Sequence, residues 1–235
     1  MEKKEKLYSG KAKVMYATDD DNLLIQHFTD NATAFNGKKK GIIKNKGVIN
    51  NKITEKVFKL LESKGIKTHF VDVLNDREML VKKLDIVMVE LVIRNYAAGS
   101  LVKRLGFEYG QKLDFPLIEY FYKSDELDDP MLNKYHIKLM NLCTEEELSF
   151  MEKTILKVNE ILVEYFKTIN INLIDFKLEF GRFNGEILLG DEFTPDGSRL
   201  WEIGTNEILD KDRFRKDLGG VDESYEELCR RICGD

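Results

Sequence analysis

The chain has 235 residues, of which 43% are hydrophobic and 34% are charged, a composition typical of a folded protein with a sizeable core. Its formal net charge of -5 argues against a general nucleic-acid binder, because such domains usually carry a basic excess. No apolar run approaches the roughly 20 residues that span a bilayer, and no signal-peptide pattern opens the chain, so we expect a cytoplasmic protein without a membrane partner.

Residues 1 to 84 are predicted to form a small lobe of antiparallel sheet with one helix. Apolar residues on both sides of the acidic turn DDDN indicate two short strands. Apolar residues then recur at helical spacing from Ile49 to Leu61, and Gly65 lies just past them, as expected at the end of a helix. The strand-like stretches THFVDVL and EMLVKKL follow. Between Lys38 and Lys52 the chain has several lysines and no acidic residue, which favours a solvated surface over an anion site.

Residues 85 to 235 are predicted to form a second lobe that mixes helices and strands. The stretch LDIVMVELVIRN is typical of one long strand, with Glu90 and Arg94 on the face opposite its alternating apolar residues. A Thr-x-x-Glu capping box at 144 to 147 starts a long helix whose apolar stripe reaches residue 169. The strand LIDFKLEFG, a hairpin turn at Asn184 and Gly185, and a helix around SYEELCRRI complete the lobe.

The first candidate motif, YSGKAK, places Gly10 before Lys11, Ala12 and Lys13. A glycine lets the backbone approach a phosphate closely, and lysines at alternate positions on a strand point the same way. The stretch is not the Gly-x-x-x-x-Gly-Lys phosphate loop, because Glu5 occupies the position of the first glycine. Two solvated lysines on a surface hairpin give the same pattern, and on this motif alone we favour that interpretation.

The second motif, RNYAAGS, begins with Arg94 at the end of an apolar strand and ends with Ser100 before the short helix LVKRLG. An arginine followed by small residues and a helix N-terminus has the layout of an anion site. Ser100 acting only as a helix cap explains the pattern equally well.

The third and strongest motif joins LIDFKLEFG to GDEFTPDGSRLWE. Period-two alternation places Asp175, Lys177 and Glu179 on one face of a strand, opposite three apolar side chains. Glu179 and Asp191 could together hold Mg²⁺, which accepts one or two protein carboxylates along with phosphate oxygens. Lys177, charged between two carboxylates, could stabilise a phosphoryl group in transfer. The alternative is an ordinary cross-strand salt bridge, which leaves Asp175, Asp191 and Arg199 unexplained.

A metal shared by these two carboxylates requires an irregular hairpin. A two-residue turn with regular pairing places Asp191 opposite Leu178, on the wrong face for Glu179. A three-residue loop with a bulge at Gly185 shifts the register by one, and a bulge at Gly190 would also serve. We therefore predict an irregularity between residues 173 and 193.

The blocks SGKAKVMY, VELVIRNYAAGSLVKRLG, LIDFKLEFG and LLGDEFTPDGSRLW, in this order and at this spacing, resemble the SAICAR synthetases, the phosphoribosylaminoimidazole-succinocarboxamide synthases of purine biosynthesis. The resemblance runs from Leu7 to Ile232, and the last two blocks are its most specific part. It implies an ATP-dependent ligase that joins L-aspartate to carboxyaminoimidazole ribonucleotide, giving SAICAR, ADP and phosphate. It also implies a homodimer with a two-lobed α+β fold, in which ATP lies between the lobes as in kinases and ATP-grasp enzymes.

The resemblance further implies roles for single residues. The residues implied for ATP are Gly10, Lys11, Ala12, Lys13, Lys82, Leu84 and Lys123. Those implied for the ribonucleotide phosphate are Arg94, Ser100 and Arg199, with Asp175 and Lys177 as catalytic residues near the reacting carboxylate. Those implied for Mg²⁺ are Glu179 and Asp191, and charge alone assigns Lys211 and Arg215 to aspartate. Two positions depart from the family pattern: Met88 stands where proline is frequent, and Asn36 stands where aspartate is frequent and receives no metal role.

Two rival functions stay open at this stage. A small-molecule kinase of similar fold would use the same lysines and carboxylates to phosphorylate a hydroxyl group. A nucleotide-sensing module without catalysis would need no site for an acceptor substrate, so it would not account for Arg94, Ser100 and Arg199.

Overall fold

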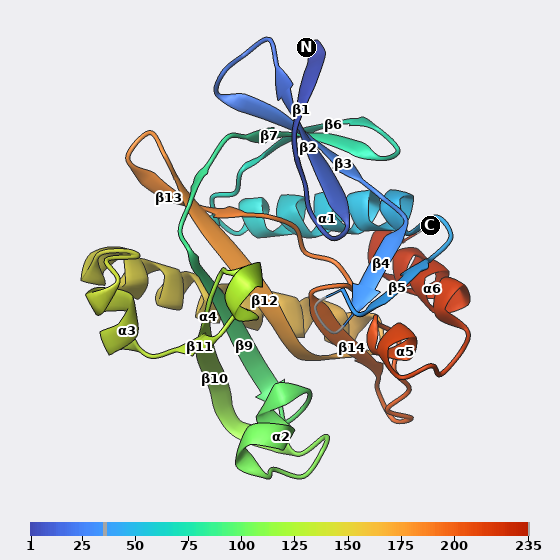
Figure 1. Cartoon of the computed structure of the whole chain (residues 1–235). Coiled ribbons are helices and arrows are strands. Elements are labelled where there is room, and N and C mark those ends of the chain that lie inside the picture. Colours follow the sequence, from blue (N-terminus) through green and yellow to red (C-terminus); the bar gives the residue numbers. More distant parts are fainter. Residues whose placement is uncertain (35–36, 235) are drawn as a thin grey trace.

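The computed structural model describes residues 1 to 34 and 37 to 234, and most of its strands belong to two antiparallel sheets (Figure 1). The first sheet has five strands in the order β1-β2-β3-β7-β6. They are β1 (Lys3–Ser9), β2 (Lys13–Thr18), β3 (Leu23–Phe28), β6 (Phe70–Asn75) and β7 (Glu78–Lys82). A separate ribbon of β4 (Asn31–Ala34) and β5 (Lys39–Ile42) lies beside the C-terminal helices (Figure 1).

The second sheet is built around β12. Its seven strands follow the order β11-β10-β9-β12-β13, and β14 and β8 also pair with β12. They are β8 (Asp85–Ile86), β9 (Val89–Tyr96), β10 (Lys112–Tyr122), β11 (Met131–Leu132), β12 (Ile171–Phe183), β13 (Glu186–Gly190) and β14 (Ser198–Glu202). The mixed α+β class with antiparallel sheets is therefore confirmed.

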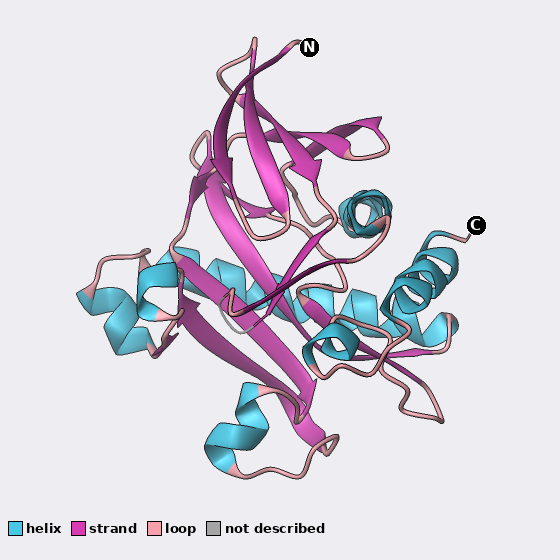
Figure 2. Cartoon of the chain, turned by 45° about the vertical axis from the view of Figure 1, so that its right-hand side comes forward, coloured by secondary structure: helices cyan, strands magenta, loops and turns pink. Residues whose placement is uncertain are grey.

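Helices join the two sheets into one hydrophobic core (Figure 2). The long ones are α1 (Lys46–Ser63), which packs against β3 and α6 (Val221–Cys233), and α4 (Glu145–Thr168), which packs along β12. The short ones are α2 (Ser100–Leu105), η1 (Asp125–Leu127), α3 (Lys134–Leu139) and α5 (Asp212–Arg215). In the described part of the chain, no helix is long and apolar enough to cross a membrane.

The predicted capping box at the start of α4 is confirmed. The Thr144 hydroxyl accepts a hydrogen bond from the Glu147 amide at 3.1 Å, and the Glu147 carboxylate accepts one from the Thr144 amide at 2.9 Å. The predicted end of α1 is also confirmed, because the helix stops at Ser63 and Gly65 has a φ of +83°. Sequence signals that rest on local hydrogen bonding therefore located these boundaries correctly.

The single long strand predicted for residues 84 to 95 is wrong in one respect. The structure divides it into β8 and β9 at Val87 and Met88. The Val87 amide donates to the Phe180 carbonyl at 2.9 Å, and the Met88 carbonyl accepts from the Lys123 amide at 3.2 Å. Both β8 and β9 pair with β12, and the break lies where β9 also begins to pair with β10, at Val89.

The hairpin between β12 and β13 turns at Asn184 and Gly185, as predicted, and of the two irregularities considered for it the three-residue loop does not form. Phe183 pairs with Glu186 across a two-residue turn, and pairing stays regular as far as Gly190. Asn184 and Gly185 have φ values of +50° and +81°, which match the twist of a tight hairpin. The irregularity instead comes directly after β13, where Asp191 has a φ of +61°. This left-handed residue ends the regular pairing and changes the direction of the chain.

Candidate active site

Strand β12 carries a row of charged side chains on one face. Phe176, Leu178 and Phe180 fill the other face and are almost fully buried, as the alternation predicted. Asp175 and Glu179 are buried too, at 3% and 7% exposure. Ionised carboxylates in such places require charged or hydrogen-bonding partners, and the structure supplies them.

Lys177 is the centre of a cluster of opposite charges. Its Nζ lies 2.9 Å from Glu179 Oε1 and 3.0 Å from Glu90 Oε2. The same Nζ lies 3.6 Å from Asp191 Oδ2, because the left-handed turn at Asp191 brings this carboxylate to the charged face. Lys123 Nζ lies 2.6 Å from Glu179 Oε1. The Glu179 and Asp191 carboxylates thus converge on one ammonium group.

Charge, rather than burial, decides the ionisation of this cluster. Burial by itself would lower the pKa of the Lys177 ammonium, but neighbouring carboxylates, Glu179 first, raise it well above its ordinary value. Burial would likewise raise the pKa of Glu179, but the surrounding lysines hold it well below its ordinary value. At neutral pH both groups are therefore charged.

These carboxylates fit a magnesium ion that is shared with a nucleotide. Among the residues that the structure describes, no group of three or more His, Cys, Asp or Glu side chains could hold a metal ion by itself. Mg²⁺ needs only one or two protein carboxylates when phosphate oxygens and waters complete its shell. Glu179 and Asp191, whose carboxylates lie 2.9 Å and 3.6 Å from the same Lys177 Nζ, are the two candidates for such a site.

The turn between β1 and β2 connects the first sheet to this cluster. The Gly10 amide donates to the Lys13 carbonyl at 2.8 Å and closes the turn, with Ala12 buried inside it. Lys13 contacts the carboxylates that follow β13, and Lys11 Nζ lies 2.9 Å from Asp125 Oδ1. The expectation that both lysines alternate along one strand is wrong, because Lys11 lies in the turn before β2.

Lys82 and Leu84 lie where the chain passes from the first sheet to the second. Lys82 Nζ donates to the Thr68 carbonyl at 3.2 Å. Leu84 packs over Gly181 and Gly190 so closely that a Cβ on either glycine would lie 2.6 Å or 2.7 Å from its side chain. The connecting segment is thereby held against the hairpin that carries Glu179 and Asp191.

Asp175 forms a second charged cluster, in which it accepts hydrogen bonds from two arginines. Its Oδ2 accepts hydrogen bonds from Arg94 Nη1 at 2.6 Å and from Arg199 Nη1 at 2.8 Å. Arg94 Nη2 donates in turn to Ser100 Oγ at 3.1 Å. The structure therefore brings together the residues expected at the ribonucleotide phosphate. Arg94 is buried among its partners, whereas Arg199 keeps part of its side chain exposed.

Gly99 allows Arg199 to lie under the start of α2. Its φ is +55°, and a Cβ there would lie 2.5 Å from Arg199 Nη2. Both the backbone conformation and the close approach favour glycine. Ser100 is the first residue of α2 rather than its cap, and it makes no side-chain capping bond, so the helix-cap explanation of Ser100 is wrong.

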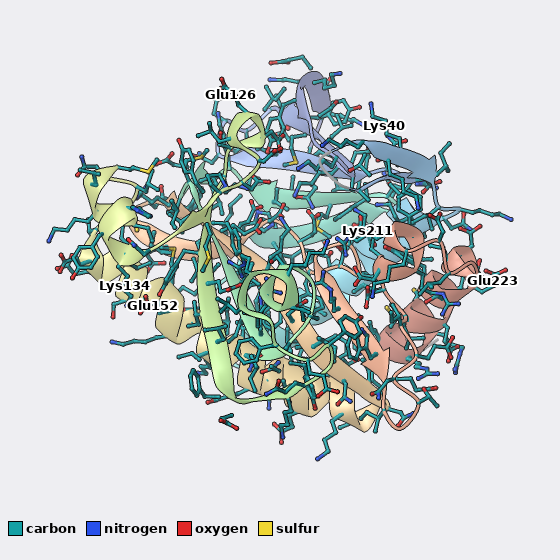
Figure 3. All side chains as sticks on the ribbon, turned by 60° about the horizontal axis from the view of Figure 1, so that its bottom comes forward. Lys40, Glu126, Lys134, Glu152, Lys211 and Glu223 are labelled. Carbon is teal, nitrogen blue, oxygen red and sulfur yellow. The ribbon has the colours of Figure 1, made fainter. Side chains whose placement is uncertain are left out.

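Lys211, labelled in Figure 3, directly precedes α5, and Arg215 ends this helix. Both contact Asp196. Lys211 Nζ lies 3.8 Å from Asp196 Oδ1, and Arg215 Nη2 donates to the Asp196 carbonyl at 3.3 Å. Burial lowers the pKa of Lys211 to about 8, although Asp196 opposes the shift. Arg215 has the more exposed side chain of the two, at 28% against 8%.

The sequence patterns gave no role in the site to several charged residues that complete these clusters. They are Lys46, Glu90, Glu119, Glu192, Asp196 and Asp212. Lys46 is fully buried, with its Nζ 2.6 Å from Asp196 Oδ2, so the solvated interpretation of the lysine run is wrong for this residue. Asn36 lies outside the described residues.

Known proteins resemble this chain over nearly its whole length. The SAICAR synthetase family model matches residues 6 to 232. The phosphoribosylaminoimidazole-succinocarboxamide synthase of Caldanaerobacter subterraneus subsp. tengcongensis is 55% identical over 232 residues, 99% of either chain. The crystal structure of the synthase from Ehrlichia chaffeensis has a TM-score of 0.95 and 48% identity, covering 97% of this chain and 98% of that one. A SAICAR synthetase in complex with ADP also has a TM-score of 0.95 at 48% identity, covering 98% of each. The chain therefore belongs to the SAICAR synthetase family.

Proposed function

We propose that this chain joins L-aspartate to carboxyaminoimidazole ribonucleotide in purine biosynthesis, using ATP and giving SAICAR, ADP and phosphate. The observation that carries the proposal is the placement of two charged clusters side by side on β12. Residues Asp175 and Lys177 share a face and are separated by roughly 7 Å along the strand. A substrate held by the arginines around Asp175 can therefore reach a phosphoryl group held beside Lys177.

ATP would lie between a lobe of residues 1 to 84 and a lobe of residues 85 to 235, in an arrangement similar to kinases and ATP-grasp enzymes. All strands of the first sheet come from the first lobe, while Lys11 and Lys13 contact residues of the second. The segment from Gly10 to Lys13 would cover the phosphates. Lys82 and Leu84 would lie at the adenine, and Lys123 would lie near the nucleotide.

Glu179 and Asp191 would hold Mg²⁺ together with phosphate oxygens of the nucleotide. When bound, the ion would offset negative charge that develops on the phosphoryl group in transfer. Lys177 would supply a fixed positive charge at the same place, because its neighbouring carboxylates keep it protonated.

The ribonucleotide phosphate would be bound by Arg94, Ser100 and Arg199. Arg199 would approach it from its exposed side, and Arg94 would mainly fix the positions of Ser100 and Asp175. Arg215, assisted by Lys211, would bind the carboxylates of aspartate, because Arg215 shares Asp212 with Arg199 and Lys211 directly precedes α5.

The reaction would proceed in two steps. A carboxylate oxygen of the ribonucleotide would attack the γ-phosphorus of ATP, and the bond to the bridging oxygen would break to release ADP. The neutral amine of aspartate would then attack the acyl carbon, phosphate would leave, and the nitrogen would lose a proton to give the amide. Lys177 would stabilise charge in the first step, and Asp175 would keep both arginines in place.

A turnover assay in which one component is omitted at a time tests this function. We expect ADP, phosphate and the succinocarboxamide to appear together, and only when ATP, Mg²⁺, the ribonucleotide and L-aspartate are all present. A small-molecule kinase would make ADP with a phosphorylated product and no free phosphate. A nucleotide-sensing module would make neither. ADP formed at the same rate without aspartate, and without an amide product, would refute the ligase.

The enzyme would act as a homodimer in the cytoplasm, where ATP is available. Support for a dimer comes from large apolar side chains exposed on α2 and β10, with Leu105 at 66% and Phe115 at 69%. Light scattering should give twice the chain mass of 27.3 kDa. A mass equal to that of one chain at micromolar concentration would contradict the dimer.

A further inference from the structure

A continuous series of ion pairs runs through the proposed ribonucleotide site. In order, its members are Arg104, Glu119, Arg94, Asp175, Arg199, Asp212 and Arg215. Cations and carboxylates alternate along the series, and each of its carboxylates is only 3% exposed. The members come from four neighbouring strands of the second sheet, β10, β9, β12 and β14, and from α2 and α5. The series therefore connects two helices that lie on either side of the candidate site.

Asp212 joins the two proposed substrate sites within this series. Its Oδ2 accepts a hydrogen bond from Arg199 Nε at 3.0 Å, and its Oδ1 accepts one from Arg215 Nη1 at 2.6 Å. One buried carboxylate thus holds both arginines, each through a different oxygen. Arg199 belongs to the proposed ribonucleotide site, and Arg215 belongs to the proposed aspartate site.

The backbone of Asp212 is itself held by the Asp210 carboxylate. The Asp212 amide donates to Asp210 Oδ1 at 2.7 Å, and the Leu200 amide donates to Asp210 Oδ2 at 2.8 Å. Leu200 directly follows Arg199, so fully buried Asp210 fastens the start of α5 to β14 beside that arginine. Burial opposes ionisation of Asp212, but Arg199 and Arg215 outweigh it and bring its pKa to about 2. At neutral pH the carboxylate is charged.

We propose that Asp212 is a positioning residue that sets the distance between Arg199 and Arg215, and through them the distance between the ribonucleotide and aspartate. The proposal rests on the function proposed above. An attacking amine and its acyl carbon must be held at about 3 to 3.5 Å for efficient reaction. Arg199 stays bonded to Asp175 without Asp212, whereas Arg215 loses the carboxylate that fixes its guanidinium.

Steady-state kinetics of Asp212→Asn test the proposal, because asparagine keeps the shape and removes the charge. We expect KM for aspartate to rise about tenfold, KM for the ribonucleotide to rise less because Arg199 keeps its bond to Asp175, and KM for ATP to change less than about twofold. Glu119→Gln is the matched control, since Glu119 is equally buried but holds Arg94 and Arg104 at the other end of the series. It should raise KM for the ribonucleotide and leave KM for aspartate unchanged.

The double variant separates positioning from a general loss of structure. With Arg215→Ala already present, Asp212→Asn should not raise KM for aspartate further, because the arginine through which it acts is gone. A further rise of the same size would overturn the proposal. If Arg215→Ala raises KM for aspartate and Asp212→Asn does not, the positioning role fails and the proposed function stands. If Arg215→Ala itself has no effect on KM for aspartate, the aspartate assignment and the positioning role fail together.

A second substitution keeps the test valid if Asp212→Asn does not fold. Asp212→Glu retains the buried charge but displaces the carboxylate by one methylene group. We expect KM for both substrates to rise while KM for ATP stays the same. Unchanged KM values for aspartate and the ribonucleotide in Asp212→Glu would overturn the proposal.

Discussion

At the scale of single residues, the candidate site consists of charges that are partly or fully buried and remain ionised only because they are paired. Lys177 and Glu179 illustrate this, because burial would shift the pKa of each toward neutralisation and their mutual attraction prevents it. Removing one member of such a pair leaves the other without compensation. Single substitutions on the charged face of β12 should therefore affect catalysis more strongly than their size implies.

Glu179→Gln should reduce kcat by a factor of about 10² or more, because it removes charge from the proposed metal site and keeps nearly the same shape. The measurement is turnover at saturating substrates and Mg²⁺. Glu186→Gln is the control, since Glu186 is on the same hairpin but is exposed and paired with Lys67. That variant should keep its kcat. Full activity in Glu179→Gln would exclude this residue from the metal site.

Arg199→Ala should raise KM for the ribonucleotide more than KM for ATP. Its guanidinium is bonded to Asp175 in the second cluster, whereas the proposed ATP site lies around Lys177 and the turn between β1 and β2. Initial rates measured against each substrate in turn give the two KM values. An unchanged dependence on ribonucleotide concentration would contradict the assignment of Arg199.

The sequence predicted on which face of β12 each charged residue lies, but it did not predict most of the residues that form ion pairs in the two clusters. Alternation alone placed Asp175, Lys177 and Glu179 together. Glu119 and Asp212 were missed because they meet Arg94 and Arg199 only through the pairing of distant strands and the docking of α5. Periodic patterns report which face a residue occupies, and they contain no information about contacts across the sheet.

At the scale of elements, the sequence was most reliable where an element has an apolar stripe or a specific cap. Helix α4 has both and was predicted, whereas β1 has only exposed residues and was missed. Helices α3 and α5 were missed because six and four residues are too few to establish a helical period. The sequence left the position of the hairpin irregularity open, because the left-handed residue that reorients the chain is Asp191, a residue type without a strong preference for that conformation.

Gly181→Ala should destabilise the fold where β12, β8 and Leu84 meet. The added Cβ would lie 2.6 Å from Leu84 Cβ and 2.9 Å from the Asp85 carbonyl oxygen, and backbone cannot move aside without breaking strand pairing. We expect a loss of about 1 to 3 kcal/mol in the free energy of unfolding, measured with urea. Gly10→Ala is the control, because its nearest contact would be an ordinary 3.6 Å. Equal midpoints for both variants would contradict this account.

At the scale of the whole molecule, buried carboxylates paired with cations make the free energy of unfolding depend on pH. The pKa of Asp212 is about 2 in the folded chain, against an ordinary value of 3.8. Between these values the unfolded chain binds more protons, so the contribution is present above pH 4 and is lost as pH falls through about 2. Its full size is about 2 kcal/mol. The gap in unfolding free energy between the parent and Asp212→Asn should therefore be smaller at pH 3 than at pH 7, and an equal gap would contradict the shift.

The buried pair of Lys46 and Asp196 fastens the two halves of the chain to each other. Lys46 is the first residue of α1 and is fully buried. Asp196 lies between β13 and β14, where it pairs with Lys46 and also accepts a hydrogen bond from the Tyr225 hydroxyl at 2.6 Å. Burial would raise the pKa of Asp196, but Lys46 is the main cation that lowers it well below its ordinary value. Removing the lysine would leave a buried carboxylate with too little compensating charge.

Lys46→Met should therefore lower the free energy of unfolding by about 3 kcal/mol at pH 7, measured by urea denaturation followed through the single tryptophan, Trp201. Lys44→Met is the matched control, because Lys44 is two positions away in the same lysine-rich run and is exposed. Its midpoint should match that of the parent. Since Trp201 lies in the second sheet and Lys46 in α1, a shift in the tryptophan signal would also establish that the two halves unfold together. If Lys46→Met shifts the midpoint no more than Lys44→Met does, the pair does not hold the two halves together.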